Sequence, residues 1–128
     1  MQKGETEPEE HGPNEPGASL RADISGRIAA LYREHYGQGP EKIKTYIQDD
    51  TVLCVLRGGA TQFEKTLSTT GDEATVRAVR SAFQELLANP FTVAIQELTG
   101  RRVEAYFSGN SHDPDISVEV FVLEQNPA

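Results

Sequence analysis

Several short segments of the chain hold residue types that could bind a ligand or react. The segment Ser111-His112-Asp113-Pro114-Asp115 brings an imidazole and two carboxylates within five residues, and these are donor types of a weak surface metal site. The same residue types are common in hairpin turns, and no cysteine pair, HExxH spacing or EF-hand pattern accompanies them. We therefore interpret this segment as a polar turn and predict neither a metal nor a cofactor.

A second segment could hold a small anion. Gly58 and Gly59 follow Arg57 and precede a Thr-x-x-Glu sequence that starts at Thr61. This sequence predicts a capping box, in which Thr61 and Glu64 satisfy backbone amides at the start of a helix. Amides exposed at such a position can bind an anion, although the P-loop and dinucleotide patterns are absent. An anion site at Arg57, Gly58, Gly59 and Thr61 is one alternative function, and a metal site at His112, Asp113 and Asp115 is another.

The remaining reactive residue types favour structural roles. Cys54 lies in an apolar run without a neighbouring cation, so we predict a buried thiol and not a nucleophile. Arg77 and Arg80 are three residues apart and could grip an acidic segment of a partner or pair with carboxylates of the chain itself. No GxSxG elbow occurs, and no pair of carboxylates has a recognisable catalytic spacing. We predict that the protein is not an enzyme.

Composition limits the class of protein further. The chain has 128 residues, with 12 Lys and Arg against 20 Asp and Glu, and a formal net charge of −8. This balance argues against a non-specific nucleic-acid binder and against a polybasic membrane anchor. One cysteine rules out a disulfide framework, and no apolar run is long enough to cross a bilayer. Since the start of the sequence lacks an apolar leader, we expect a cytoplasmic protein that does not insert into the membrane.

The charge is unevenly distributed along the chain and suggests one domain with a tail. Residues 1–19 hold five glutamates, three prolines and three glycines, so we expect a disordered acidic tail there. Residues 20–128 are long enough for a single domain. Its first helix should begin near Leu20, present Ile24, Ile28, Leu31 and His35 on one face, and end at Gly37.

The patterning of the domain predicts hairpins separated by helices. Alternating residues 43–47, a turn at Asp49-Asp50 and the apolar segment 51–57 form the first hairpin. A short helix should follow the Thr61 box, and a second box from Thr70 to Glu73 should open a long helix. Asn89-Pro90 predicts a kink or break in that helix.

The second hairpin should comprise strands near 103–107 and 116–123 with a long polar turn at 108–115. We place Ile116, Val118, Val120 and Val122 inward on the last strand, which leaves Phe121 and Leu123 on the opposite face. The order α-ββ-αα-ββ predicts an α+β fold, with a four-stranded, mainly antiparallel sheet and helices packed on one face. An apolar patch on the other face would favour a homodimer or a docking partner.

Several runs of sequence together resemble a known family. They are Arg33–Tyr46, Thr61–Leu67, Val76–Arg80, Glu97–Val103 and Val120–Leu123, and they are similar to the MpsC-like family over roughly residues 20–124. The family takes its name from the third component of a sodium-translocating, membrane-potential-generating system, so the resemblance implies an association with membrane ion-transport or inorganic-carbon-uptake machinery. It implies no reaction for this component.

These observations predict a non-enzymatic, cytoplasmic accessory protein. We expect it to be a homodimer and to bind a protein partner. A membrane transport component is one candidate for this partner. The expected contacts are a corner after the first helix and one face of the long helix, formed by Arg33, Glu34, His35, Tyr36, Gly37, Gly39, Pro40, Arg77 and Arg80.

Overall fold

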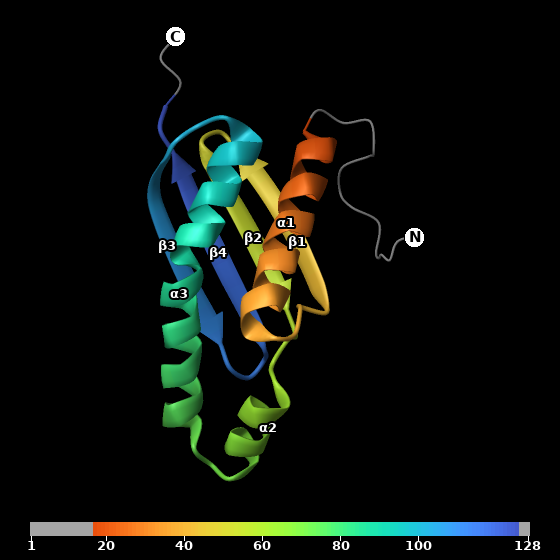
Figure 1. The fold of residues 1–128 in the computed structure, drawn as a ribbon, viewed down its shortest axis with the longest axis vertical. Helices are drawn as coiled ribbons and strands as arrows, with labels where there is room; N and C mark the ends of the chain where they lie inside the picture. The colour runs from red at the N-terminus through yellow and green to blue at the C-terminus, as the bar shows by residue number, and fades with distance from the viewer. Residues whose placement is uncertain (1–16, 126–128) are drawn as a thin grey trace.

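The computed structural model describes residues 17–125, without the side chains of Gln62, Phe63 and Ser68. Its elements are α1 (Ala18–Tyr36), β1 (Lys42–Gln48), β2 (Thr51–Arg57), α2 (Gln62–Thr69), α3 (Glu73–Thr99), β3 (Val103–Ser111) and β4 (Ile116–Leu123). This order confirms the predicted α+β class (Figure 1). Most of the predicted acidic tail lies outside the described residues, but Ala18 and Ser19, assigned to that tail, form the start of α1.

The four strands form one antiparallel sheet in the order β1-β2-β4-β3. The first hairpin turns at Asp49 and Asp50 as predicted, and Asp49 has the left-handed φ of 54° that an aspartate tolerates in a tight turn. Because β2 and β4 pair at the centre, the two hairpins merge into a single layer. The second hairpin has a shorter turn than predicted, since β3 continues to Ser111.

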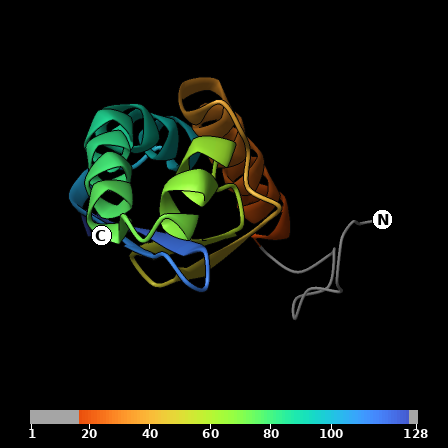
Figure 2. The same ribbon diagram turned by 90° about the horizontal axis from the view of Figure 1, so that it is seen from below.

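All three described helices lie on the same side of the sheet (Figure 2). On α1, Ile24 and Ile28 are fully buried as predicted, and Leu31 packs half-buried against the core. Tyr32 and Tyr36 complete the buried row, whereas His35 is only half-buried. The helices and the sheet enclose one core, made of Ile24, Ile28, Tyr32, Tyr36, Val52, Cys54, Leu56, Leu87, Phe91, Ile95, Phe121 and Leu123.

The predicted orientation of β4 is wrong. Phe121 and Leu123 face the helices and are 0% and 3% exposed, whereas the row that contains Val118 and Val120 is half-buried on the other side. The buried row also contains Ser117 and Glu119, and these two polar residues made it look like a solvent-facing row. The apolar surface opposite the helices therefore exists, but other residues form it.

Of the kink or break predicted at Asn89-Pro90, the break does not occur, because α3 runs without interruption from Glu73 to Thr99 with Pro90 inside it. Its axis changes direction about halfway along (Figure 1). Buried side chains on both sides of the proline, among them Leu87 and Phe91, hold the helix together against the loss of one backbone hydrogen bond.

The second predicted capping box does not form. Asp72 is the N-cap of α3, and its carboxylate accepts from the Thr75 amide at 3.4 Å. The Thr70 hydroxyl, in the turn after α2, instead donates to the Leu67 carbonyl in the last turn of that helix at 2.7 Å.

Candidate functional site

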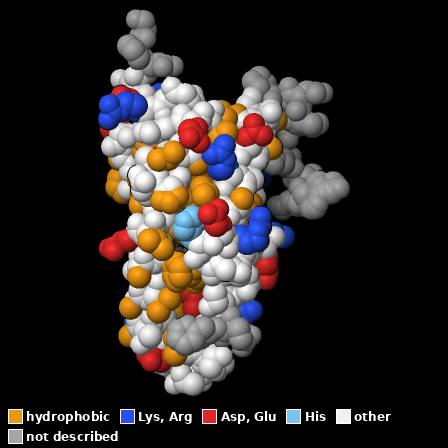
Figure 3. All heavy atoms as spheres, in the orientation of Figure 1, with side chains coloured by type: hydrophobic (Ala, Val, Ile, Leu, Met, Phe, Trp, Pro, Cys, Tyr) orange, Lys and Arg blue, Asp and Glu red, His pale blue; other side chains and the backbone are white. Residues whose placement is uncertain are grey.

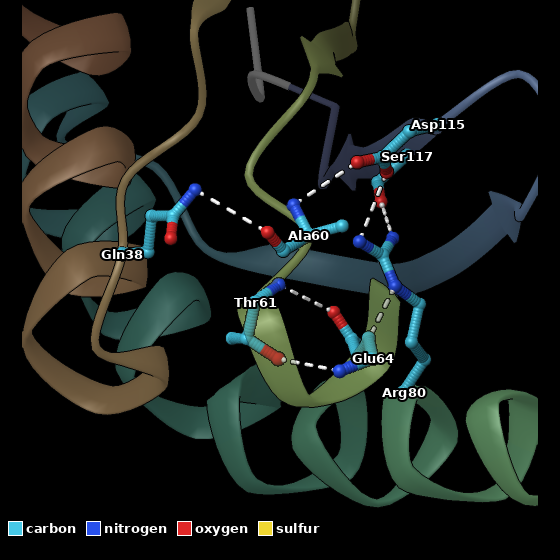
Figure 4. A network of polar contacts seen from close by, with 7 residues as sticks. All are labelled: Gln38, Ala60, Thr61, Glu64, Arg80, Asp115 and Ser117. Carbon is cyan, nitrogen blue, oxygen red and sulfur yellow. Dashed lines mark hydrogen bonds and ion pairs between the residues drawn. The ribbon is translucent and has the colours of Figure 1, made fainter. Parts of the chain in front are cut away.

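Two glycine-containing turns, which the sequence suggested as separate sites, lie against each other. The side-chain Nε2 of Gln38, after α1, donates to the backbone carbonyl of Ala60, after β2, at 3.3 Å (Figure 4). Gly59 is buried with a φ of +95°, and a Cβ added there would lie 3.3 Å from Gly39 O and from Pro40 Cα. Glycine is therefore required at Gly59, because the backbones of the two turns are in contact.

Side chains from three more elements reach this contact and form what we call the polar junction. Its members are Gln38, Ala60, Thr61, Glu64, Arg80, Asp115 and Ser117 (Figure 4).

The predicted capping box at the start of α2 is confirmed. The Thr61 amide donates to Glu64 Oε1 at 2.9 Å, and the Glu64 amide donates to Thr61 Oγ1 at 3.1 Å. The other carboxylate oxygen, Glu64 Oε2, accepts from Arg80 Nε at 3.1 Å. The Glu64 carboxylate thus accepts from the Thr61 amide, just before α2, and also pairs with Arg80 of α3.

Arg80 connects this helix start to the sheet. Its Nη1 donates to Ser117 Oγ at 3.2 Å, its Nη2 pairs with Asp115 Oδ1 at 2.9 Å, and its guanidinium lies 5.9 Å from the centroid of the Tyr36 ring. The side chain is only 4% exposed. This guanidinium holds α2 and the sheet together, because its removal would leave both Glu64 and Asp115 without their cation.

Three backbone amides of the loop that was considered for anion binding already donate hydrogen bonds within the chain. The Gly58 amide donates to the Asp115 carbonyl and the Ala60 amide to Asp115 Oδ2, each at 3.0 Å. The Thr61 amide is bonded to Glu64. The carboxylates of the chain itself occupy the positions that an anion would take, while Arg57 is exposed at the end of β2.

The residues considered for partner binding divide into exposed and buried ones. Arg33, Glu34, Gly37 and Arg77 are exposed, and His35, Gly39 and Pro40 are half-buried. Tyr36 and Arg80 are 6% and 4% exposed, so neither can contact a partner directly.

The segment considered for metal binding makes the turn between β3 and β4. Asp113 is exposed, whereas Asp115 points to Arg80 and to the Ala60 amide. Within residues 17–125, no three His, Cys, Asp or Glu side chains are grouped so that they could hold a metal ion.

A small, partly open cavity beside the polar junction contains a carboxyl group that the sequence analysis missed. The cavity has a volume of about 20 Å³, room for a single water molecule, and is lined by Tyr32, Tyr36, Arg80, Phe83, Gln84, Leu87, Ser117 and Glu119. Burial raises the pKa of Glu119 to about 7, although a hydrogen bond donated by the Tyr106 hydroxyl opposes the shift. Glu119 is therefore a buried group that exchanges its proton near neutral pH. The sequence contained one indication that Glu119 is buried, because it lies in the same alternating row as Phe121 and Leu123.

The buried thiol and phenols near the cavity are not activated. Burial raises the pKa of the Cys54 thiol to about 12 and that of Tyr32 to about 12. The thiol therefore stays protonated, which is the opposite of what a nucleophilic cysteine needs. The prediction that Cys54 is a buried core residue is confirmed.

The helical surface carries a strip of hydrophobic side chains (Figure 3). Leu86 and Val93 on α3 are 59% and 40% exposed, and because they are seven residues apart they lie on the same side of the helix. Large apolar side chains exposed together often mark a contact surface.

Comparison with known proteins identifies the class of this chain. Residues 17–125 match the MpsC family, described as "Na+-translocating membrane potential-generating system (MpsC)", so the chain belongs to that family, as its resemblance implied. It is also 29% identical over 100 residues to the uncharacterized protein YrhF of Bacillus subtilis (strain 168), over 77% of this chain and 82% of YrhF. No solved structure matches the chain. None of the described helices is both long and apolar enough to span a bilayer.

Proposed function

We propose that this protein is a non-enzymatic, cytoplasmic accessory protein of a Na+-translocating, membrane-potential-generating system, and that it acts by binding a protein component of that system. The description of its family supports the connection to the system. The charges of the polar junction pair with one another, and this pairing and the unactivated Cys54 support a role without catalysis.

The observation that carries the binding role is the exposed pair Leu86 and Val93 on α3. Both side chains could be polar without loss to the core, because neither of them is buried. Burying such side chains against a partner is favourable by about 25 cal/mol per Å² of apolar surface.

Charged side chains of both signs lie at the ends of the two long helices. Arg33 and Glu34 are exposed near the end of α1, and Arg77 is exposed near the start of α3. Exposed charges of this kind set orientation and association rate more than affinity. They remain our candidates for selecting the partner, whereas Arg80 and Tyr36 act by holding the corner in place.

The test is sedimentation of the purified chain with inverted membrane vesicles from the organism that encodes it. We expect the chain to sediment with these vesicles, and Leu86→Lys to reduce the bound fraction at least tenfold. Ser81→Lys, at an exposed position on a different side of α3, is the matched control and should bind normally.

Vesicles treated with protease before mixing separate a protein partner from the lipid. Loss of binding to treated vesicles supports a protein partner. Equal binding to treated and untreated vesicles, or no binding by the unaltered chain, would contradict the proposed function.

A further inference from the structure

The face of the sheet that points away from the helices is apolar at its centre, and we call it the outer face. Its central residues are Leu53 and Val55 of β2, Val118, Val120 and Val122 of β4, and Phe107 of β3. An antiparallel sheet with one face in water normally alternates apolar and polar residues. Here β2 is apolar in the middle of both faces and β4 is apolar along its whole outward row, and this pattern is typical of a sheet that is covered on each side.

The register brings the apolar side chains into a continuous band. Tyr46 pairs with Leu53, Leu53 with Val120, and Val120 with Phe107, so one row crosses all four strands. Phe107 is 60% exposed at the end of this row. Within residues 17–125, no helix covers the band (Figure 2).

The cations of the outer face lie on one side of it. The alternation along the strands places Lys42 and Lys44 of β1 and Arg57 of β2 on this face, and the Lys44 ammonium lies 5.2 Å from the centroid of the Tyr46 ring. The side that contains β3 has no cation in its outward row.

The residues before α1 are poorly suited to cover the band. Apart from Met1 and its prolines, the segment 1–16 is made of polar, charged and glycine residues. It could neutralise the lysines, but it has too few apolar side chains to fill a face of valine, leucine and phenylalanine.

The size of the outer face suits a second copy of the chain. Strands about 4.8 Å apart, with a rise of about 3.3 Å per residue, give four strands of this length a projected area of roughly 500 Å². Two copies would remove at least about 1,000 Å² in projection, and more in accessible surface, which reaches the range of specific interfaces that begins near 1,200 Å². Two sheets commonly pack in this way, about 10 Å apart.

We propose that two copies of this chain pack outer face to outer face, around a two-fold axis parallel to the strands. This axis places β1 over β3 of the second copy and so keeps the lysines of the two copies apart. An axis across the strands would stack β1 on β1 and bring like charges together. The dimer has two inner sheets and leaves both helical faces, with Leu86 and Val93, open for the partner. The inference goes beyond the proposed function, because it assigns a contact between two copies of the chain to the face opposite Leu86 and Val93.

Light scattering coupled to size exclusion tests the dimer. We expect the unaltered chain to elute with a mass near 28 kDa, twice the 14.0 kDa of one chain. Val120→Lys, at the centre of the band, should elute as a monomer with an unchanged circular dichroism spectrum. Leu86→Lys is the matched control on the helical face and should remain a dimer.

Phe107→Glu provides a second variant if Val120→Lys fails to fold, because Phe107 is largely exposed and lies outside the core. It should also be a monomer. A monomeric unaltered chain at 200 µM would overturn the inference, and so would a folded Val120→Lys or Phe107→Glu that remains dimeric. Vesicle binding and Leu86→Lys report on the proposed function separately, so failure of one proposal is distinguishable from failure of the other.

Discussion

Arg80 Nε lies 3.1 Å from Glu64 Oε2, and this contact joins α3 to the first turn of α2. Both side chains are buried, at 4% and 1% exposure. The pair lies sixteen residues apart in the sequence and forms only when α2 folds back against α3. This pairing explains why Arg80 is buried, whereas Arg77, one turn earlier on α3, is exposed.

The first prediction concerns this buried pair. Arg80→Met should lower the free energy of unfolding by about 3 kcal/mol, because it leaves Glu64 buried without a cation. Adding Glu64→Gln should recover part of this loss, since glutamine keeps the capping box and carries no charge. Urea unfolding of the two single variants and the double variant measures the coupling.

Arg77→Met is the control for this experiment, because Arg77 is exposed and should change stability by less than about 0.5 kcal/mol. Equal effects of the Arg77 and Arg80 variants would mean that the buried network contributes nothing.

The second prediction concerns Gly26, in the middle of α1. No heavy atom lies within 4 Å of a Cβ added at this position, so no close backbone approach explains the glycine. Gly26→Ala should therefore raise the free energy of unfolding by about 1 kcal/mol. The check is the melting temperature, which should rise by several degrees.

Gly37→Ala is the matched control for Gly26→Ala. Gly37 ends α1 with a φ of +89°, where an alanine is strained, so this variant should be destabilised by about 1 kcal/mol. A Gly26→Ala variant that melts at or below the unaltered chain would contradict the prediction.

The sequence predicted the elements of the fold better than their faces. Local signals such as Asp49-Asp50, the Thr61 box and Gly37 determine where chain segments turn, and each acts as predicted. The prediction of which face of β4 is buried failed, because both rows of side chains on this strand are apolar apart from Ser117 and Glu119. Alternation alone cannot distinguish a buried polar residue with a partner from a solvated one.

The candidate site was predicted in its parts and missed in its assembly. The glycine turns, Arg80 and Asp115 were each singled out, but their contact depends on pairings between residues that are far apart in the sequence. The same applies to α3, where long-range burial of Leu87 and Phe91 outweighs the local effect of Pro90.

The third prediction concerns the hydrogen bond from Tyr106 to Glu119. Tyr106→Phe removes the donor and should raise the pKa of Glu119 further, because this hydrogen bond lowers it. We expect a loss of about 1–2 kcal/mol in stability, larger at pH 8 than at pH 5, since the ionised carboxylate depends more on the donor. Tyr46→Phe, on the outer face, is the control and should show no such dependence on pH.

The last prediction concerns the titration of Glu119 itself. Its pKa is raised from 4.5 to about 7 in the folded state, chiefly by burial, so between these values the folded state binds the proton more tightly than the unfolded state. The contribution of Glu119 to the free energy of unfolding is therefore complete below about pH 4.5. It falls by roughly 3 kcal/mol as the pH rises to about 7.

The variant Glu119→Gln tests this titration, because its side chain stays neutral and keeps an oxygen that accepts from Tyr106. The difference in unfolding free energy between Glu119→Gln and the unaltered chain should be near zero at pH 4.5 and favour the variant by about 2–3 kcal/mol at pH 8. Glu104→Gln, at an exposed position of β3, corrects for the general loss of a negative charge. Parallel stability curves for the Glu119 variant and the unaltered chain across this range would show that Glu119 is already ionised in the fold.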